Sequence, residues 1–267
     1  MRTAPTSLAL EAIRREAARR GLDRYDWPTI ARPNQLPPDG NWTTWLLLAG
    51  RGFGKTRTGA EYVRMQIEND RAHRVALIAP TAADTRDVMV EGESGLLNVC
   101  PPWNRPKYEP SKRRLTWPNG AIATLYSADE PERLRGPQHD LVWADELAAW
   151  RYPEAWDMSM LGLRLGTPRA VVTTTPKPNK LIRALVDSST TTVTRGSTFD
   201  NRANLAPTFL EQILAKYEGT RLGRQELYAE VLTDMDTEER REARSAGQAL
   251  DDMLFSDEAL FGGIDLA

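Results

Sequence analysis

An apolar run that ends in a glycine-rich loop constrains the fold of this chain more than any other feature. Residues 45–48 read Trp-Leu-Leu-Leu, and residues 49–56 read Ala-Gly-Arg-Gly-Phe-Gly-Lys-Thr. This order predicts a buried strand at 44–49, a phosphate-binding loop, and a helix at 55–69. The backbone N–H groups of such a loop and the positive end of the following helix point at the same anion. We therefore expect the substrate to be a nucleoside triphosphate.

The side chains of the loop have separate expected roles. Lys55 would reach the terminal phosphates, and Thr56 would place its hydroxyl group on Mg²⁺. Arg51 either contacts a phosphate or faces the solvent. Ala49 stands where the general pattern has its first glycine, so a chance glycine-rich turn is the alternative. The residues expected to bind the nucleotide are Gly50, Arg51, Gly52, Phe53, Gly54, Lys55 and Thr56.

A second apolar run ends in two carboxylates. Residues 141–144 read Leu-Val-Trp-Ala, and Asp145 and Glu146 follow them. Asp145 suits a contact with Mg²⁺, either direct or through an intermediate ligand. Glu146 suits orienting and deprotonating the attacking water. Alone, the pair would be best interpreted as an acidic turn after a strand. Because it follows a phosphate loop in the sequence, on a second apolar strand, it favours hydrolysis over nucleotide binding without turnover.

Three further features have both an ordinary and a functional interpretation. Thr173, Thr174 and Thr175 end a predicted strand, where threonine is common, but their hydroxyl groups would also lie at the ligand edge of a parallel sheet. Arg135 lies on a loop, where most arginines are solvated. Gln35 lies in a proline-rich loop, and its amide could read an adenine edge, although spacing alone favours a surface glutamine.

The composition narrows the class of protein. The chain has 267 residues, which is enough for one large α/β domain. One cysteine and two histidines exclude an internal disulfide and a His/Cys zinc site. No stretch approaches the roughly 20 apolar residues that span a membrane. Residues 232–267 carry ten acidic residues and three arginines, so the remainder of the chain is mildly basic, which is compatible with nucleic acid.

Strands and helices are predicted to alternate, which implies a mostly parallel sheet with helices on both faces. The expected strands are 44–49, 74–79, 140–144, 169–175 and 191–195, with a hairpin formed by 114–117 and 121–126. The expected helices are 55–69, 82–90, 153–160, 179–187 and 207–232. The domains expected from this order are an N-terminal helical segment at 1–30, a P-loop ATPase domain at 31–205, a helical lid or linker at 206–233, and an acidic tail at 234–267.

The combined motifs resemble the large terminase subunit of tailed phages, the motor that packages DNA. Residues 49–61 are similar to its Walker A segment, and residues 31–38 are similar to its adenine-contacting segment. The segments 79–84, 91–95 and 173–176, and Arg135-Gly136 ahead of the Asp-Glu strand, also match, so the resemblance covers about residues 25–233.

The resemblance implies a RecA-like P-loop ATPase fold with a small C-terminal helical lid. It implies that ATP and Mg²⁺ bind, that Gln35 contacts adenine, and that Thr173, Thr174 and Thr175 couple hydrolysis to movement. It also implies that Arg135 acts on the nucleotide of a neighbouring subunit, unless Arg51 takes this role in cis.

The resemblance also implies partners: double-stranded DNA, a portal protein and a small terminase subunit. The chain would be monomeric when isolated and would form a homo-oligomeric ring when active, in the cytoplasm of a bacterial host and without a membrane. Large terminases usually continue into a nuclease domain. Residues 234–267 could therefore be the truncated start of such a domain instead of an acidic tail, with residues 261–265 as its first strand. Asp265 alone cannot hold two metal ions, so we expect no nuclease activity from this chain.

Two other functions stay open at this level. A RecA-like helicase or another DNA-stimulated ATPase would share the loop, but a two-domain helicase needs a second RecA-like domain for which 267 residues leave no room. A nucleotide-binding protein that assembles on nucleotide without significant turnover would not need Asp145 and Glu146.

Overall fold

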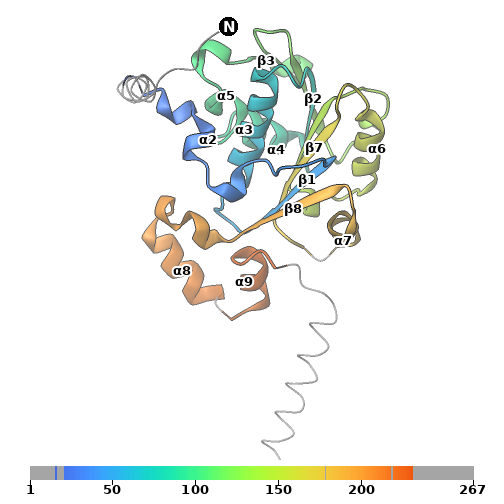
Figure 1. The fold of residues 1–267 in the computed structure, drawn as a ribbon. Coiled ribbons are helices and arrows are strands. Elements are labelled where there is room, and N and C mark those ends of the chain that lie inside the picture. Colours follow the sequence, from blue (N-terminus) through green and yellow to red (C-terminus); the bar gives the residue numbers. More distant parts are fainter. Residues whose placement is uncertain (1–15, 17–20, 178, 218, 231–267) are drawn as a thin grey trace, which may run out of the picture. The chain divides into compact units, whose positions relative to one another are not determined.

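Eight strands form one sheet in the part of the chain that the computed structural model describes, which is residue 16 and residues 21–177, 179–217 and 219–230. Their order across the sheet is β3-β4-β5-β2-β6-β7-β1-β8 (Figure 1). The strands are β1 (Thr44–Ala49), β2 (Arg74–Ala79), β3 (Lys107–Glu109), β4 (Arg114–Thr116), β5 (Ile122–Ser127), β6 (Leu141–Asp145), β7 (Arg169–Thr174) and β8 (Thr191–Gly196).

The neighbouring strands from β5 to β8 are all parallel, whereas β3, β4 and β5 pair antiparallel. The predicted α/β class and mostly parallel sheet are therefore confirmed. The short strand β3 was not predicted, because three residues carry too little alternation to be recognised. Every residue of β1 and β6 is buried, as expected for strands that are covered on both faces.

Helices cover the sheet on its two sides. In Figure 1, α3 and α5 lie on one side, and α6 and α7 lie on the other. The helices are α2 (Trp27–Ile30), α3 (Lys55–Glu68), α4 (Ala82–Asp84), α5 (Leu96–Val99), α6 (Glu154–Gly162), α7 (Lys180–Asp187), α8 (Pro207–Tyr217) and α9 (Arg221–Glu226). None of the helices in the described part of the chain is long and apolar enough to cross a membrane.

Helix α3 joins the phosphate loop to the core of the domain. Its side chains Ala60, Val63 and Ile67 are fully buried, at the helical spacing seen in the sequence. Gly59 allows α3 to approach the sheet closely, because a Cβ atom there would lie 2.3 Å from the indole of Trp143. Any larger residue at this position would push α3, and the loop before it, away from β6.

The structure corrects one predicted helix and refines another. The single helix expected over 207–232 is wrong, because α8 and α9 are separated by a turn in which Gly219 has φ +74° and Thr220 accepts a hydrogen bond from the N–H of Gly223. No side chain of α8 is buried, and residues 227–230 are not helical. The helix expected over 82–90 is helical over that range, as one turn of α4 followed by the π-helical turn Thr85–Val90.

The proposed domain boundaries stay predictions. Most of the N-terminal segment 1–30 and the whole of the acidic tail 234–267 lie outside the described residues.

Candidate nucleotide-binding site

The glycine-rich loop connects the carboxyl end of β1 to the first turn of α3. Gly52 and Gly54 have φ values of +74° and +98°, a left-handed conformation that other L-residues rarely adopt. Lys55 is the first residue of α3, so the N–H groups at the amino end of the helix open onto the same loop. Strands β6 and β7 lie beside β1, and their carboxyl ends therefore reach the same edge of the sheet.

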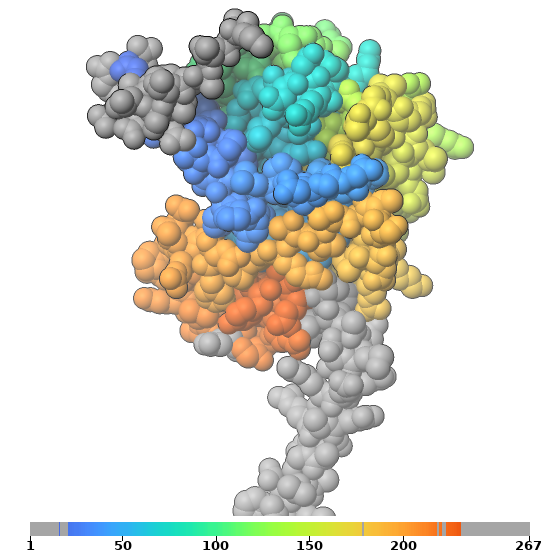
Figure 2. Space-filling model, viewed as in Figure 1, coloured from blue at the N-terminus to red at the C-terminus, as the bar shows by residue number. Residues whose placement is uncertain are grey.

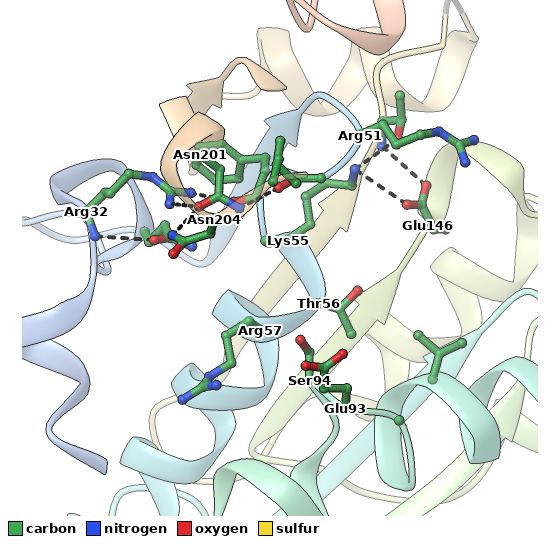
Figure 3. Close-up of a pocket in the computed structure, with 18 of the residues that line it drawn as sticks. Arg32, Arg51, Lys55, Thr56, Arg57, Glu93, Ser94, Glu146, Asn201 and Asn204 are labelled. Atoms are coloured by element: carbon green, nitrogen blue, oxygen red, sulfur yellow. Dashed lines mark hydrogen bonds and ion pairs between the residues drawn. The ribbon is translucent and has the colours of Figure 1, made fainter. Parts of the chain in front are cut away.

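A cavity of about 1070 Å³ lies over this edge. Of the residues expected from the sequence to bind nucleotide, all except Gly50 line it, as Figure 3 shows in part. The expected residues that line it are Gln35, Arg51, Gly52, Phe53, Gly54, Lys55, Thr56, Glu146 and Thr175. A cavity of this volume can hold a nucleotide-sized ligand.

Lys55 is held at the mouth of the loop by three acceptors. Its Nζ atom donates to the backbone oxygens of Ala49 at 3.0 Å and Gly50 at 3.2 Å, and to the hydroxyl oxygen of Thr175 at 3.0 Å. The side chain is buried, and its Nζ atom also lies 3.7 Å from Oε1 of Glu146. An ammonium group has three donors, so these three hydrogen bonds occupy all of them.

Asp145 is buried beneath the cavity and does not line it. Its Oδ1 atom accepts a 2.6 Å hydrogen bond from the hydroxyl group of Thr173. Its backbone oxygen accepts one from the indole N–H of Trp150 at 2.9 Å. Burial, and then the nearby charge of Glu146, raise the pKa of Asp145 to about 7. A cation bound nearby would lower this pKa again, because it would favour the charged form of the carboxyl group.

Glu146 points into the cavity, although it follows Asp145 directly. It has φ 48°, a left-handed conformation that is uncommon for a non-glycine residue. Its N–H donates to the backbone oxygen of Thr173, and its Oε2 atom accepts from the N–H of Thr175 at 3.3 Å. These bonds turn the second carboxylate toward the phosphate loop, while the first stays beneath it.

The three threonines make three different contacts. Thr173 donates to Asp145, Thr174 accepts from the N–H of Ala148 at 3.0 Å, and Thr175 accepts from Lys55. Only Thr175 lines the cavity, whereas Thr173 and Thr174 are fully buried. The three hydroxyl groups therefore cannot all contact a phosphate in this arrangement.

Gln35 and the two arginines occupy different places. Gln35 is buried at the cavity wall, where its Nε2 atom donates to the hydroxyl group of Thr58 at 3.1 Å. Arg51 lines the cavity with 69% of its side chain exposed, and its Nε atom lies 3.7 Å from Oε2 of Glu226. Arg135 is 71% exposed and lies outside the cavity, where it pairs with Glu132 at 3.6 Å.

Several lining residues were not identified from the sequence as site residues. Arg32 and Asn201 lie together on one side of Lys55, and Glu93 and Ser94 lie near Thr56 in Figure 3. Arg32 and the pair at 93–94 lie in segments that match the large terminase pattern, but nothing local marks them as part of a site. Asn201 follows β8, and no motif includes it.

The oxygen ligands at this site fit a Mg²⁺ ion that is held mainly by the phosphates of a nucleotide. No group of three or more His, Cys, Asp or Glu residues in the described part of the chain could enclose a metal ion. Mg²⁺ is commonly held by one or two protein oxygens together with substrate phosphates and waters. The Thr56 hydroxyl group lines the cavity, and the Asp145 carboxyl group lies beneath it, which matches that kind of site.

Comparison with known proteins identifies the family. The family described as terminase large subunit, T4likevirus-type, N-terminal, matches residues 46–244. The chain belongs to the terminase large subunit family. No curated protein matches this terminase sequence.

Solved structures share the fold of this terminase chain. The large terminase ATPase domain of Thermus phage P74-26 has a TM-score of 0.58 and 17% identity, covering 72% of this chain and 90% of that domain. The large terminase of another thermophilic bacteriophage, in complex with ADP, has a TM-score of 0.60 and 15% identity. That match covers 79% of this chain and 52% of the other protein, so this chain spans about half of its length. The same phage protein in complex with ATP-gamma-S matches with a TM-score of 0.57 and 13% identity.

Proposed function

We propose that this chain hydrolyses ATP, with Mg²⁺, to move double-stranded DNA into a viral procapsid. The observation that carries the proposal is the 3.7 Å pair between Lys55 and Glu146 at the mouth of the glycine-rich loop. A cation for the terminal phosphates and a carboxylate for the attacking water thus face each other over one cavity. Membership of the terminase large subunit family supports the packaging role.

The roles of the side chains follow from where charge develops during phosphoryl transfer. Lys55 would exchange its bonds to the loop carbonyls and to Thr175 for bonds to the β- and γ-phosphates. Glu146 would orient the attacking water and accept its proton. Mg²⁺, when bound, neutralises charge on the phosphates, and Thr56 and Asp145 would hold it.

The remaining site residues would complete the site around this centre. Gln35 would recognise adenine from the cavity wall. Gly50, Gly52, Phe53 and Gly54 would bring the backbone close to the phosphates. Arg135 is exposed and outside the cavity of its own chain, so it would stabilise the transition state in a neighbouring subunit. Arg51 in cis is the alternative for this charge.

The assembly follows from the same proposal. A motor that translocates DNA must surround it, so the active form would be a homo-oligomeric ring on a portal protein, and the isolated chain would be a monomer with low activity. The further partners would be DNA and a small terminase subunit, in the cytoplasm of a bacterial host.

The decisive test is Glu146→Gln. We expect this variant to bind ATP like the parent chain and to lose steady-state release of phosphate, because the amide cannot accept a proton from water. Glu154→Gln is the matched control, because Glu154 is exposed at the start of α6 and does not line the cavity. Turnover at the parent rate in Glu146→Gln would show that another group is the catalytic base.

A further inference from the structure

Three consecutive carbonyl groups of the phosphate loop are held from outside the loop. The backbone oxygen of Arg51 accepts from the hydroxyl group of Thr198 at 2.7 Å. The oxygen of Gly52 accepts from the side-chain amide of Asn201 at 2.7 Å. The oxygen of Phe53 accepts from the guanidinium group of Arg32. The donors come from two segments that are far apart in the sequence, yet their bonds fall on successive peptide groups.

The direction of a carbonyl group fixes the direction of the next N–H group. In a trans peptide, the C=O of one residue and the N–H of the following residue point to opposite sides. Holding the oxygens of residues 51–53 outward therefore turns the N–H groups of residues 52–54 inward. The N–H groups of Gly52 and Gly54 have no acceptor among the described residues, whereas that of Phe53 donates to the oxygen of Gly50 at 3.3 Å. Two free donors with left-handed glycines form an anion-binding concavity.

The donors are themselves fixed by other contacts. Oδ1 of Asn201 accepts from Nη1 of Arg32 at 2.6 Å, and the guanidinium group of Arg32 lies 4.6 Å from the ring centroid of Phe53. Thr198 is fully buried, and its N–H donates to the backbone oxygen of Leu227 at 2.8 Å.

The two supporting segments also meet each other. Asn34, close to Arg32 in the sequence, donates to Asp200 at 3.2 Å, in the 3-10 helix Thr198–Asn204 that follows β8. Figure 2 shows the corresponding blue and orange surfaces against each other, and Figure 3 shows Arg32, Asn201 and Asn204 grouped on one side of Lys55. The loop is thus supported by a connected structure and not by isolated bonds.

We propose that Thr198 and Asn201 are positioning residues, which orient the phosphate loop for nucleotide before the nucleotide arrives. The inference rests on the proposed function of the same cavity and adds two residues to it. A loop without these donors would still have its glycines, but its peptide groups could rotate toward water. Binding would then have to fix them again, and a site that is ordered in advance avoids this cost.

The first experiment compares Thr198→Val with Thr198→Ser. Valine has nearly the shape of threonine and cannot donate to Arg51, whereas serine keeps the hydroxyl group. We expect Thr198→Val to weaken the binding of Mg-ADP and Mg-ATP about tenfold, the effect of one lost hydrogen bond. The KM for ATP should rise by a similar factor and kcat should change much less, while Thr198→Ser should stay close to the parent chain. Equal dissociation constants for the valine and serine variants would overturn the proposal.

The second experiment uses Asn201, in case Thr198→Val does not fold. Asn201→Asp keeps an oxygen for Arg32 but removes the donor to Gly52, whereas Asn201→Leu removes both. Asn204→Asp is the charge control, because Asn204 lines the same cavity and bonds Asn201 instead of a loop carbonyl. We expect Asn201→Asp to bind Mg-ADP several-fold more weakly than Asn204→Asp. Equal affinities for these two variants would show that charge alone, and not the bond to Gly52, affects binding.

The readout separates this inference from the proposed function. Binding and turnover by the parent chain test whether the site is an ATPase site at all. The ratio between matched variants, measured by nucleotide binding, tests only the support of the loop. We expect the melting temperatures of the variants without nucleotide not to follow the same order as their dissociation constants. A strict correlation between melting temperature and dissociation constant would indicate that the two residues affect stability alone.

Discussion

The hydroxyl group of Thr173 lies 2.6 Å from Oδ1 of Asp145 and donates a hydrogen bond to it. The indole N–H of Trp143 lies 2.9 Å from the same hydroxyl oxygen. An indole N–H can only donate, so the hydroxyl oxygen accepts from Trp143, and its own proton remains for Asp145. The carboxyl group beneath the cavity is therefore oriented by the end of β7, and its geometry depends on how β6 and β7 meet.

Replacing Thr173 by valine tests this relationship. Thr173→Val removes the donor to Asp145 and leaves the N–H of Trp143 without an acceptor, both in a fully buried position. We expect the free energy of unfolding to fall by about 1–3 kcal/mol. We also expect ATP turnover to fall roughly tenfold, because a positioned catalytic group tolerates little displacement. Thr173→Ser should retain most of both quantities. Chemical denaturation and phosphate release measure them, and parent-like turnover in Thr173→Val would contradict the positioning of Asp145 by this bond.

Replacing Thr174 by valine tests the coupling role implied by the family resemblance. The hydroxyl group of Thr174 accepts from Ala148, on the segment that follows Asp145 and Glu146, and it does not line the cavity. We therefore expect Thr174→Val to keep its affinity for ATP and to hydrolyse it with less DNA packaged per ATP. Parallel assays of nucleotide binding, hydrolysis and packaging check this. Normal packaging by a chain with valine at 173, 174 and 175 would reduce the triplet to residues that favour strands.

The parts of the site that the sequence predicts share one physical origin. The apolar runs before Ala49 and Asp145 must be buried strands, and parallel strands end at one edge of a sheet. Residues that directly follow such strands therefore lie close together at that edge, whatever the conformation of the connecting loops. This is why the loop and Glu146 could be placed around one cavity from local patterns alone.

The parts that the sequence does not predict depend on contacts between distant positions. Thr198 bonds a residue 147 positions away, and Asn201 bonds one 149 positions away. Nothing in the local pattern of either residue distinguishes it from a polar residue on a loop. The break between α8 and α9 had a local signal, Gly219, but helices tolerate an isolated glycine, and the apolar spacing up to Tyr217 favours a helix. The sequence could not show which of the two signals would dominate.

Mixed rings test whether Arg135 acts in trans. Arg135→Ala should lower ATP turnover by a factor of roughly 10³ or more, as for other arginines that act on a phosphoryl group. Its guanidinium group is outside the cavity of its own chain, so the loss should be recovered by mixing with Glu146→Gln chains, which still carry Arg135. Each inactive variant then supplies what the other lacks. Parent-like turnover by Arg135→Ala, together with a loss of turnover in Arg51→Ala that mixing with Glu146→Gln chains does not restore, would assign the role to Arg51.

Acid should destabilise the fold through the buried side chain of His139. Its ring packs edge-on against Tyr126 at 5.6 Å, and its Nε2 atom has no hydrogen-bond partner in the described part of the chain. Burial lowers the pKa of His139 from 6.5 to about 4, so the folded state disfavours the charged ring. Between these two values the unfolded chain binds a proton that the folded chain does not, and stability must therefore fall as the pH decreases from 6.5 toward 4.

The expected contribution is about 2 kcal/mol between roughly pH 7 and pH 5. His139→Phe should remove this part of the pH dependence, because phenylalanine keeps an aromatic ring and cannot titrate. His73→Phe is the matched control, because His73 is the other histidine of the chain and more than half of its side chain is exposed. The measurement is the free energy of unfolding in denaturant at several pH values. We expect the curve of His139→Phe to be flatter than that of the parent chain, and the curve of His73→Phe is the reference for replacing an exposed histidine. If all three have the same slope, the carboxyl groups alone cause the acid sensitivity.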